Sequence, residues 1–157
     1  MYRMFVRHNV RAAFAALSQG SMDLVNAMSP DVHHTFPSTG ALGGERSNRA
    51  DVAAWLERLY RVLPGLRFDV RSVAVAGWPW DTTVGVEWTN TATLLDGSTY
   101  TNTGAHILHI HNGKITSFHA YLHDVDAIDD ALAHQAAGGI DEATAPPIVS
   151  TGSGAGR

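Results

Sequence analysis

The 157-residue sequence contains no cysteine and few charged residues. Without cysteine, disulfide bonds, thiolate nucleophiles and cysteine-ligated zinc sites are excluded. Charged residues make up 17% of the chain and the formal net charge is −4. This balance argues against nucleic acid as a partner, because phosphate binding needs a basic surface. No apolar run reaches the ~18 residues that a membrane span requires. We therefore expect a cytoplasmic protein that binds neither nucleic acid nor membrane.

Apolar residues make up 45% of the chain, which is enough for one hydrophobic core. We expect residues 1–139 to form a single domain. The end of the chain differs, because Pro146-Pro147 and a run rich in serine and glycine favour irregular structure. The sequence therefore predicts a flexible C-terminal tail over residues 140–157.

Apolar residues at helical spacing dominate the first part of the chain. They predict helices over Met4–Leu17, Ser21–Met28 and, after an N-cap at Asn48, up to Leu63. Between the second and third helix, a break at Pro30-Asp31 precedes an expected strand over Val32–Phe36 and a loop over Pro37–Ser47.

From Leu66 onward the apolar pattern changes to the alternation typical of strands. Expected strands cover Leu66–Ala76, Thr82–Leu94, Thr99–Ile110 and Lys114–Leu122, and a last helix covers Asp124–Ala137. Helices followed by an antiparallel meander indicate an α+β fold. We expect the curved antiparallel sheet to wrap around the N-terminal helices and form a cone.

The lengths of two turns decide which side chains face the inside of this cone. Asp96-Gly97 and Asn112-Gly113 could each form a two-residue turn or a three-residue turn with a bulged glycine. In the first hairpin, two residues would pair Glu87 with His106, and three would pair Val86 with His106. A one-residue change inverts the facing of a whole strand. Burying valine and tryptophan gains roughly 1.5–3 kcal/mol per side chain, so we expect the second register. It turns inward Val84, Val86, Trp88, Asn90, Gly104, His106, Leu108 and Ile110, and by the same argument Phe118, Ala120 and Leu122.

His106 is the candidate catalytic group in this lining. Its imidazole can exchange a proton near neutral pH, and the Asn90 amide could orient water or stabilise an enolate oxygen. The alternative is that His106 is a structural histidine bonded to Asn90 or to a backbone carbonyl. The expected substrate-binding residues are His34, Phe36, Trp55, Trp88, Leu108, Phe118 and Leu122.

Other conspicuous residues do not indicate a further site. Five of the nine histidines lie between residues 106 and 123, but histidines on an outward strand face diverge, so we expect no metal. The Trp78-Pro79-Trp80 segment is expected to fold over one end of the cone.

Four short segments resemble a known family. They are Val32–Pro37, Val86–Thr89, Gly104–Leu108 and Asn112–Ile115, and they are similar to SnoaL-like polyketide cyclase domains of the nuclear transport factor 2-like superfamily. The resemblance covers about Val10 to Leu132. It implies a cone-shaped, cystatin-like fold with a deep hydrophobic pocket, no cofactor, and a homodimer paired through the outer sheet faces.

The resemblance also implies a function. It suggests a small-molecule enzyme that performs acid/base chemistry, such as cyclisation, isomerisation or hydration, on a hydrophobic polyketide- or terpenoid-like substrate. Steroid isomerases of the superfamily have a carboxylate base where this chain has Phe36, and an acidic group where it has His106. Two alternatives stay open. One is a non-catalytic binding or dimerisation module, and the other is an epoxide hydrolase with a rebuilt catalytic set, because Trp88 and Asn90 replace the hydrolase residues.

Overall fold

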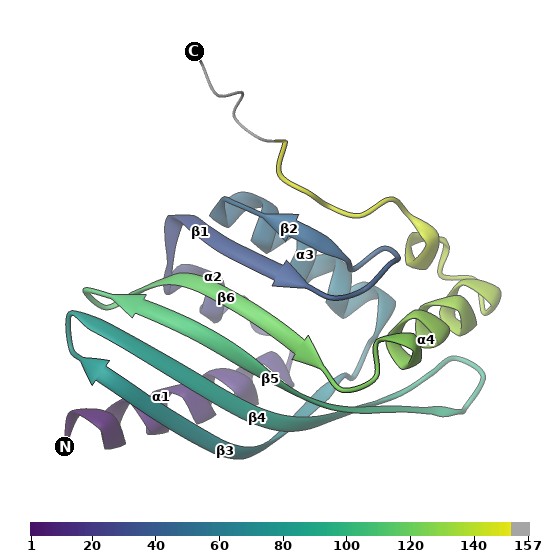
Figure 1. The fold of residues 1–157 in the computed structure, drawn as a ribbon. Coiled ribbons are helices and arrows are strands. Elements are labelled where there is room, and N and C mark those ends of the chain that lie inside the picture. The colour runs from purple at the N-terminus through teal and green to yellow at the C-terminus, as the bar shows by residue number, and fades with distance from the viewer. Residues whose placement is uncertain (152–157) are drawn as a thin grey trace.

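A computed structural model describes residues 1–151 of the chain (Figure 1). Its helices are α1 (Tyr2–Leu17), α2 (Asp23–Asn26), α3 (Arg49–Val62), α4 (Val125–Ala137) and a short 3-10 helix, η1 (Asp141–Thr144). Its strands are β1 (Met28–Phe36), β2 (Gly44–Arg46), β3 (Arg67–Trp78), β4 (Asp81–Thr93), β5 (Thr99–His111) and β6 (Lys114–Leu122). Within residues 1–151, no helix is both long and apolar enough to cross a bilayer.

Six strands of the described chain form one curved sheet in the order β2-β1-β6-β5-β4-β3. Neighbouring strands are antiparallel except β1 and β6, which are parallel. Figure 1 shows α1, α2 and α3 on one face of the sheet and α4 beyond one of its ends. The predicted α+β cone is confirmed, with one parallel strand pair in a sheet that was expected to be antiparallel throughout.

The β4–β5 turn has the predicted three-residue form. Leu94 and Ser98 are hydrogen-bonded at its base, N to O at 2.8 Å, and Gly97 takes a φ of 84°. A positive φ is accessible to glycine at little cost, which explains the residue at this place. The turn pairs Val86 with His106, so both point inward as expected.

The side chains of β6 face inward as predicted, although the β5–β6 turn does not have the three-residue form. Asn112 and Gly113 form a two-residue turn with φ of 47° and 81°, and His111 pairs with Lys114. A register shift between His109 and Ile110 then moves the pairing by one residue. Beyond this shift, residues such as Phe118 and Ala120 face inward, and both are buried.

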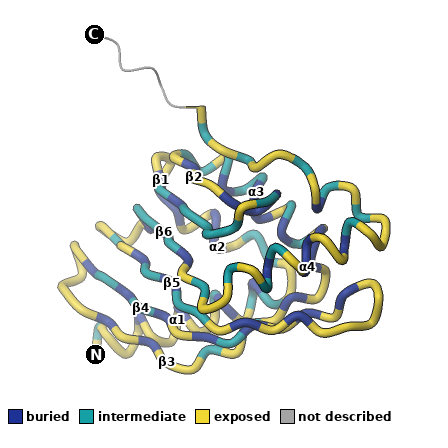
Figure 2. Tube along the Cα trace, turned by 45° about the vertical axis from the view of Figure 1, so that its right-hand side comes forward, coloured by how far each residue is buried: buried dark blue, intermediate teal, exposed yellow. Residues whose placement is uncertain are grey.

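The core lies between the inner face of the sheet and the helices. Figure 2 shows buried and exposed residues alternating along the strands, as expected of a sheet with one covered face. In α1 the buried residues Val6, Val10, Phe14 and Leu17 recur every three or four positions, which forms a single apolar stripe. In α3 the Asn48 side chain accepts a hydrogen bond from the backbone N–H of Asp51 at 2.8 Å, as an N-cap does.

Three local predictions need correction. The Pro30-Asp31 break lies inside β1, which starts at Met28, so α2 is only four residues long. The proline is tolerated because the β1–β6 pairing is interrupted between Met28 and His33. Residues 44–46 of the expected loop form β2 at the edge of the sheet.

The Trp78-Pro79-Trp80 turn does not cover the end of the cone. Its two indoles stack on each other, 5.8 Å apart and 5° from parallel, and are 66% and 58% exposed. The tight turn between β3 and β4 pairs Trp78 with Asp81, which turns the tip away from the core.

The expected tail packs on the domain as far as it is described. In η1, Glu142 accepts hydrogen bonds from Arg58 and Arg61 of α3, and the Ser150 hydroxyl donates to Asp51 at 2.6 Å. Residues 140–150 therefore pack on the domain, mainly against α3 and β2. The rest of the predicted tail, residues 152–157, lies outside the described residues.

Candidate functional site

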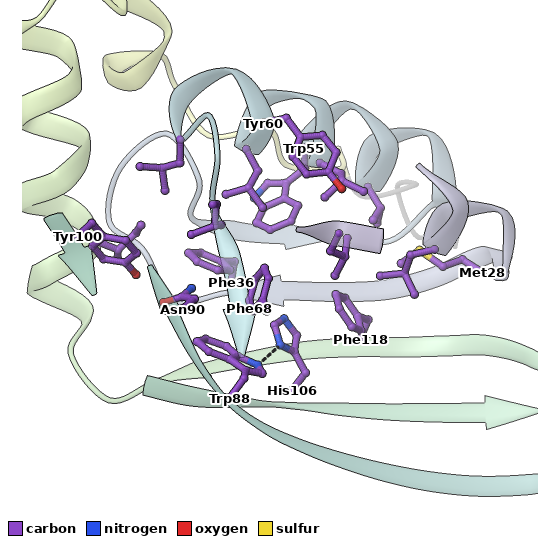
Figure 3. Close-up of a pocket in the computed structure, with 18 residues that line it drawn as sticks. Met28, Phe36, Trp55, Tyr60, Phe68, Trp88, Asn90, Tyr100, His106 and Phe118 are labelled. Atoms are coloured by element: carbon purple, nitrogen blue, oxygen red, sulfur yellow. Dashed lines mark hydrogen bonds between the residues drawn. The ribbon is translucent and has the colours of Figure 1, made fainter. Parts of the chain in front are cut away.

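A narrow apolar cavity lies between the inner face of the sheet and α3 (Figure 3). The volume that can hold the centre of a water molecule is about 30 Å³, and the whole space between the lining side chains, counted out to the opening, is about 610 Å³. Four of the expected substrate-binding residues line it, namely Phe36, Trp55, Trp88 and Phe118. Both expected catalytic residues, His106 and Asn90, line it as well.

His106 projects from the middle of β5 into an aromatic environment. Its ring stacks on Phe118 with centroids 4.4 Å apart and meets the edge of Phe14 at 5.4 Å. The indole N–H of Trp88 donates to His106 Nδ1 at 2.8 Å. In Figure 3 the second ring nitrogen points away from Trp88, toward the space between Phe68 and Phe118. The expected alternative partner, Asn90, makes no hydrogen bond to His106.

This environment fixes the protonation state of the imidazole. Burial lowers the pKa of His106 from 6.5 to about 3, so the ring is neutral at pH 7. A neutral imidazole carries one proton, and Nδ1 cannot carry it because Nδ1 accepts the Trp88 hydrogen bond. The proton is therefore on Nε2. His106 therefore presents a hydrogen-bond donor to the cavity, and not the acid/base group that its position in the sequence predicts.

Asn90 contributes an unpaired acceptor. It lies two residues after Trp88 on the same face of β4 and is 5% exposed. Its Oδ1 is buried without a hydrogen-bond partner among the described residues. A buried acceptor without a partner costs free energy, so a ligand hydroxyl or a water that donates to this oxygen would be stabilised.

Among the residues that the structure describes, no side chain that lines the cavity is ionised at neutral pH. Besides His106, its titratable lining groups are Tyr60 and Tyr100, and burial raises the pKa of each phenol to about 12. Tyr60 donates its hydroxyl proton to the Ser21 carbonyl at 2.6 Å and is not free to act as an acid. The arrangement can therefore polarise a neutral ligand but has no charged group of its own.

Three expected substrate-binding residues do not line this cavity. His34 lies behind it, stacked on Phe118 at 5.7 Å and tilted against Trp55 at 4.4 Å. Leu108 faces a different hollow under α1, and Leu122 is half-buried against the core. All three face inward as predicted, but facing inward is not sufficient to reach the cavity.

Sequence reasoning missed several residues around the cavity. Phe68 and Tyr100 line it. Tyr100 pairs with Ala92 on the predicted inward face, so extending the register of β4 and β5 would have found it. Phe68 faces inward only because of a register shift between Val70 and Ser72 of β3, which the sequence did not indicate. Arg46 is fully buried in β2 and donates from Nε to His34 Nδ1 at 2.8 Å. No sequence signal pointed to Arg46, because its position was assigned to a loop.

Arg46 has carbonyl groups as its other partners and no carboxylate. It donates to the carbonyls of Gly43, Gly44 and Ile148 at 2.6 to 2.9 Å. Burial lowers the pKa of its guanidinium from 12.5 to about 10, so it remains charged at pH 7. Arg46 thus joins β2, the chain before it and the C-terminal segment, and it fixes the ring of His34 behind the cavity. Among the described residues, no group of three or more His, Asp or Glu side chains could hold a metal ion.

Comparisons with known proteins agree with this architecture. An NTF2-like protein of unknown function from Burkholderia pseudomallei K96243 has 22% identity and a TM-score of 0.67, covering 79% of this chain and 94% of its own. TerC, co-crystallised with polyporic acid, has 25% identity and a TM-score of 0.66, covering 78% and 93%. A proposed polyketide cyclase from Pseudomonas putida KT2440 has 22% identity and a TM-score of 0.54, covering 75% and 90%.

Comparison with curated protein sequences gives no match. The profile of the SnoaL-like domain family matches residues 10–118, which run from the middle of α1 through β5 to the middle of β6. This range includes the strands that carry His106 and Asn90. Because the match covers more than half of the chain, and the fold agrees with it, the protein belongs to the SnoaL-like domain family.

Proposed function

We propose that the protein is a cofactor-free enzyme that binds a hydrophobic carbonyl compound in this cavity and polarises its carbonyl group through His106. The observation that carries the proposal is the hydrogen bond from Trp88 to His106 Nδ1, which leaves Nε2–H as a donor in an apolar space. A neutral imidazole that donates to a carbonyl oxygen stabilises the negative charge that develops there. Asn90 Oδ1 is the acceptor for a second polar group of the ligand.

The reaction class that fits is proton transfer next to the carbonyl. A carbon–hydrogen bond of the substrate breaks, its electron pair forms the enolate, and the oxygen accepts a hydrogen bond from His106 Nε2. Because no carboxylate among the described residues lines the cavity, the proton passes to a hydroxide ion from solvent, which becomes a water that donates to Asn90 Oδ1. The free volume of about 30 Å³ holds this water alone, so the side chains of the lining have to move apart for the substrate to bind beside it. Return of the proton to another carbon completes an isomerisation, and attack of the enolate carbon on a second carbonyl gives an aldol-type cyclisation.

The substrate class is inferred from the lining and from the relatives. Apart from His106 and Asn90 the walls are mainly aliphatic and aromatic, which suits a polyketide- or terpenoid-like compound. The proposed polyketide cyclase from Pseudomonas putida KT2440 and TerC with its polyporic acid share this fold and support the same class of ligand.

A second candidate is a binding module without catalysis. The small free volume and the absence of an ionised group from the cavity favour it, because a protein that only holds an apolar ligand needs neither a base nor room for a reaction. An epoxide hydrolase that activates water through His106 has weaker support, because Nε2 carries a proton and offers no lone pair.

The test is turnover and binding with a panel of hydrophobic ketones, including β,γ-unsaturated ketones and diketones able to cyclise. His106→Leu removes the donor, and we expect turnover to fall ~10²–10³-fold while the ligand still binds. His106→Gln supplies an amide N–H and should retain more activity than His106→Leu. The control is His8→Gln, an exposed histidine of α1 that lines neither hollow. Unchanged turnover in His106→Leu would refute the mechanism, and ligand binding without turnover in the wild type would establish the binding module.

We also infer that two copies pair through the outer face of the sheet. The exposed ring of Tyr121 and the polar side chains around it on this face support the inference, and the molar mass in solution tests it. A cytoplasmic location stays a prediction from the composition.

A further inference from the structure

A second hollow lies under α1, outside the His106 cavity. One side of α1 and the short α2 form its walls, and inward residues of β5 and β6 form its floor. We call it the α1 groove and define it by Phe5, Asn9, Ala12, Leu108, Ile110 and Ile115. The volume that can hold the centre of a water molecule is about 480 Å³, compared with about 30 Å³ in the His106 cavity. The groove can therefore accept a ligand without rearrangement of its side chains.

Two side chains separate the groove from the His106 cavity. Phe14 lines the groove and places its ring edge against His106, with centroids 5.4 Å apart. Leu24 lines both spaces. Both side chains are buried, so they form a wall between the two spaces. The α1 groove is a distinct site, and its occupation does not depend on the function proposed above for His106.

The groove is long and narrow, so it fits a thin ligand. It follows α1 from Tyr2 to Ala16, a distance of about 21 Å at the rise of an α-helix. Phe5, Asn9 and Ala12 line it and are exposed, whereas Leu108 and Ile115 at its base are only 2% and 6% exposed. This long and narrow shape suits a single unbranched hydrocarbon chain better than a compact ligand or a protein surface.

The charges in the lining and the exposed groups at the open end of the groove indicate which kind of ligand it can bind. Among the described residues, the lining contains one ionisable acid, Asp23, and no lysine or arginine, so no cationic side chain of the lining would hold an anionic head group. The outer end is bordered by Phe5, which is 62% exposed, and by Pro79, which lies between the exposed rings of Trp78 and Trp80. From these observations we propose that the α1 groove binds the unbranched apolar chain of a neutral amphiphile such as a long-chain alcohol.

Isoleucine methyl groups report directly on this proposal. Of the six isoleucines, Ile110 and Ile115 line the groove, Ile128 lines the His106 cavity, and the others line neither. The experiment titrates the full chain, labelled at the isoleucine methyls, with 1-decanol and separately with 1-adamantanol, a compact alcohol with the same number of carbon atoms. We expect saturable shifts of Ile110 and Ile115 with 1-decanol, and at least tenfold weaker binding of 1-adamantanol.

Two alanines of α1 provide matched variants. Ala12 is exposed and lines the groove, and Ala15 is exposed and does not. Ala12→Phe should weaken 1-decanol binding at least tenfold, Ala12→Leu should weaken it less, and Ala15→Phe should leave it unchanged. The smaller Ala12→Leu keeps the test valid if Ala12→Phe does not fold.

Three results would overturn the proposal. The first is 1-decanol binding that shifts Ile128 and not the groove methyls, and the second is equal binding by the Ala12 and Ala15 variants. The third is broadening of the groove methyls with protein concentration in the absence of 1-decanol, together with no saturable shift on its addition, which would show that a second copy of the chain covers the groove.

Discussion

Stability against acid tests the protonation state of His106, on which the proposed mechanism depends. The pKa of His106 is about 3 in the folded protein and 6.5 without burial. Between these values the unfolded chain binds a proton that the folded protein does not bind. Protonation therefore favours the unfolded chain, so the free energy of unfolding falls as the pH falls from about 6.5 toward 3. From pH 7 to pH 5, linkage gives a loss of about 2 kcal/mol for this group alone.

The variant His106→Gln isolates this contribution. A glutamine can accept the hydrogen bond from Trp88 but has no proton to gain in this range. Urea unfolding at pH 7 and pH 5 should therefore show a loss that is smaller by about 2 kcal/mol in the variant than in the wild type. Burial, and after it the charge of Arg46, also lower the pKa of His34. Because His106 is uncharged between pH 7 and pH 5, its replacement by glutamine leaves these two causes in place, and the His34 contribution cancels in the comparison. The control is His8→Gln, an exposed histidine of α1.

An equal pH dependence in His106→Gln and the wild type would refute the reasoning. It would mean that His106 is charged in the folded protein or accessible to water. In either case Nε2 would not be the neutral donor in an apolar space from which the proposed function is derived.

The remaining predictions concern groups that support the cavity. In Gly104→Ala, the new Cβ would meet the Tyr121 carbonyl and, at 2.9 Å, the ring of Trp88, so we expect a loss of about 1–3 kcal/mol in urea unfolding and a shifted tryptophan emission. Arg46→Ala leaves His34 Nδ1 and three carbonyls without their donor, and unfolding should cost about 3–5 kcal/mol less. Glu142→Gln weakens the contact with two arginines of α3, so the free energy of unfolding at pH 7 should fall by about 1 kcal/mol. The same change should make the chain after residue 140 more sensitive to proteolysis. That loss of stability should vanish near pH 2, because the same contact lowers the pKa of Glu142 to about 2.

The sequence was sufficient to predict the inner face of the sheet. Only one register of the β4–β5 hairpin buries Val84, Val86 and Trp88 together, and this difference in burial is larger than any local preference of the turn. The same argument gave the correct facing of β6 although the turn has two residues, because the register shift near Ile110 compensates for it. The apolar pattern determines which side chains face the core, and the length of the turn and the position of the register shift differ accordingly.

Elements that depend on distant partners could not be predicted in this way. Strand β2 has three residues and no apolar alternation, and it exists because residues 44–46 pair with residues 34–36 of β1. Arg46 is buried for the same reason, since the pairing places it opposite His34. The packing of residues 140–151 depends on Arg58 and Arg61, which lie more than 80 positions earlier in the chain.

The role of His106 could not be predicted from its facing alone, because a neighbouring strand sets its tautomer. Trp88 is paired with Gly104, and His106 with Val86, so the indole and the imidazole are diagonal neighbours on the inner face. The indole reaches His106 because Gly104 has no side chain, and a Cβ there would come within 3.2 Å of two ring atoms of Trp88. Three residues on two strands therefore act as one unit. The glycine admits the tryptophan, the tryptophan occupies Nδ1, and the only proton of the buried imidazole is left on the nitrogen that points away from the indole.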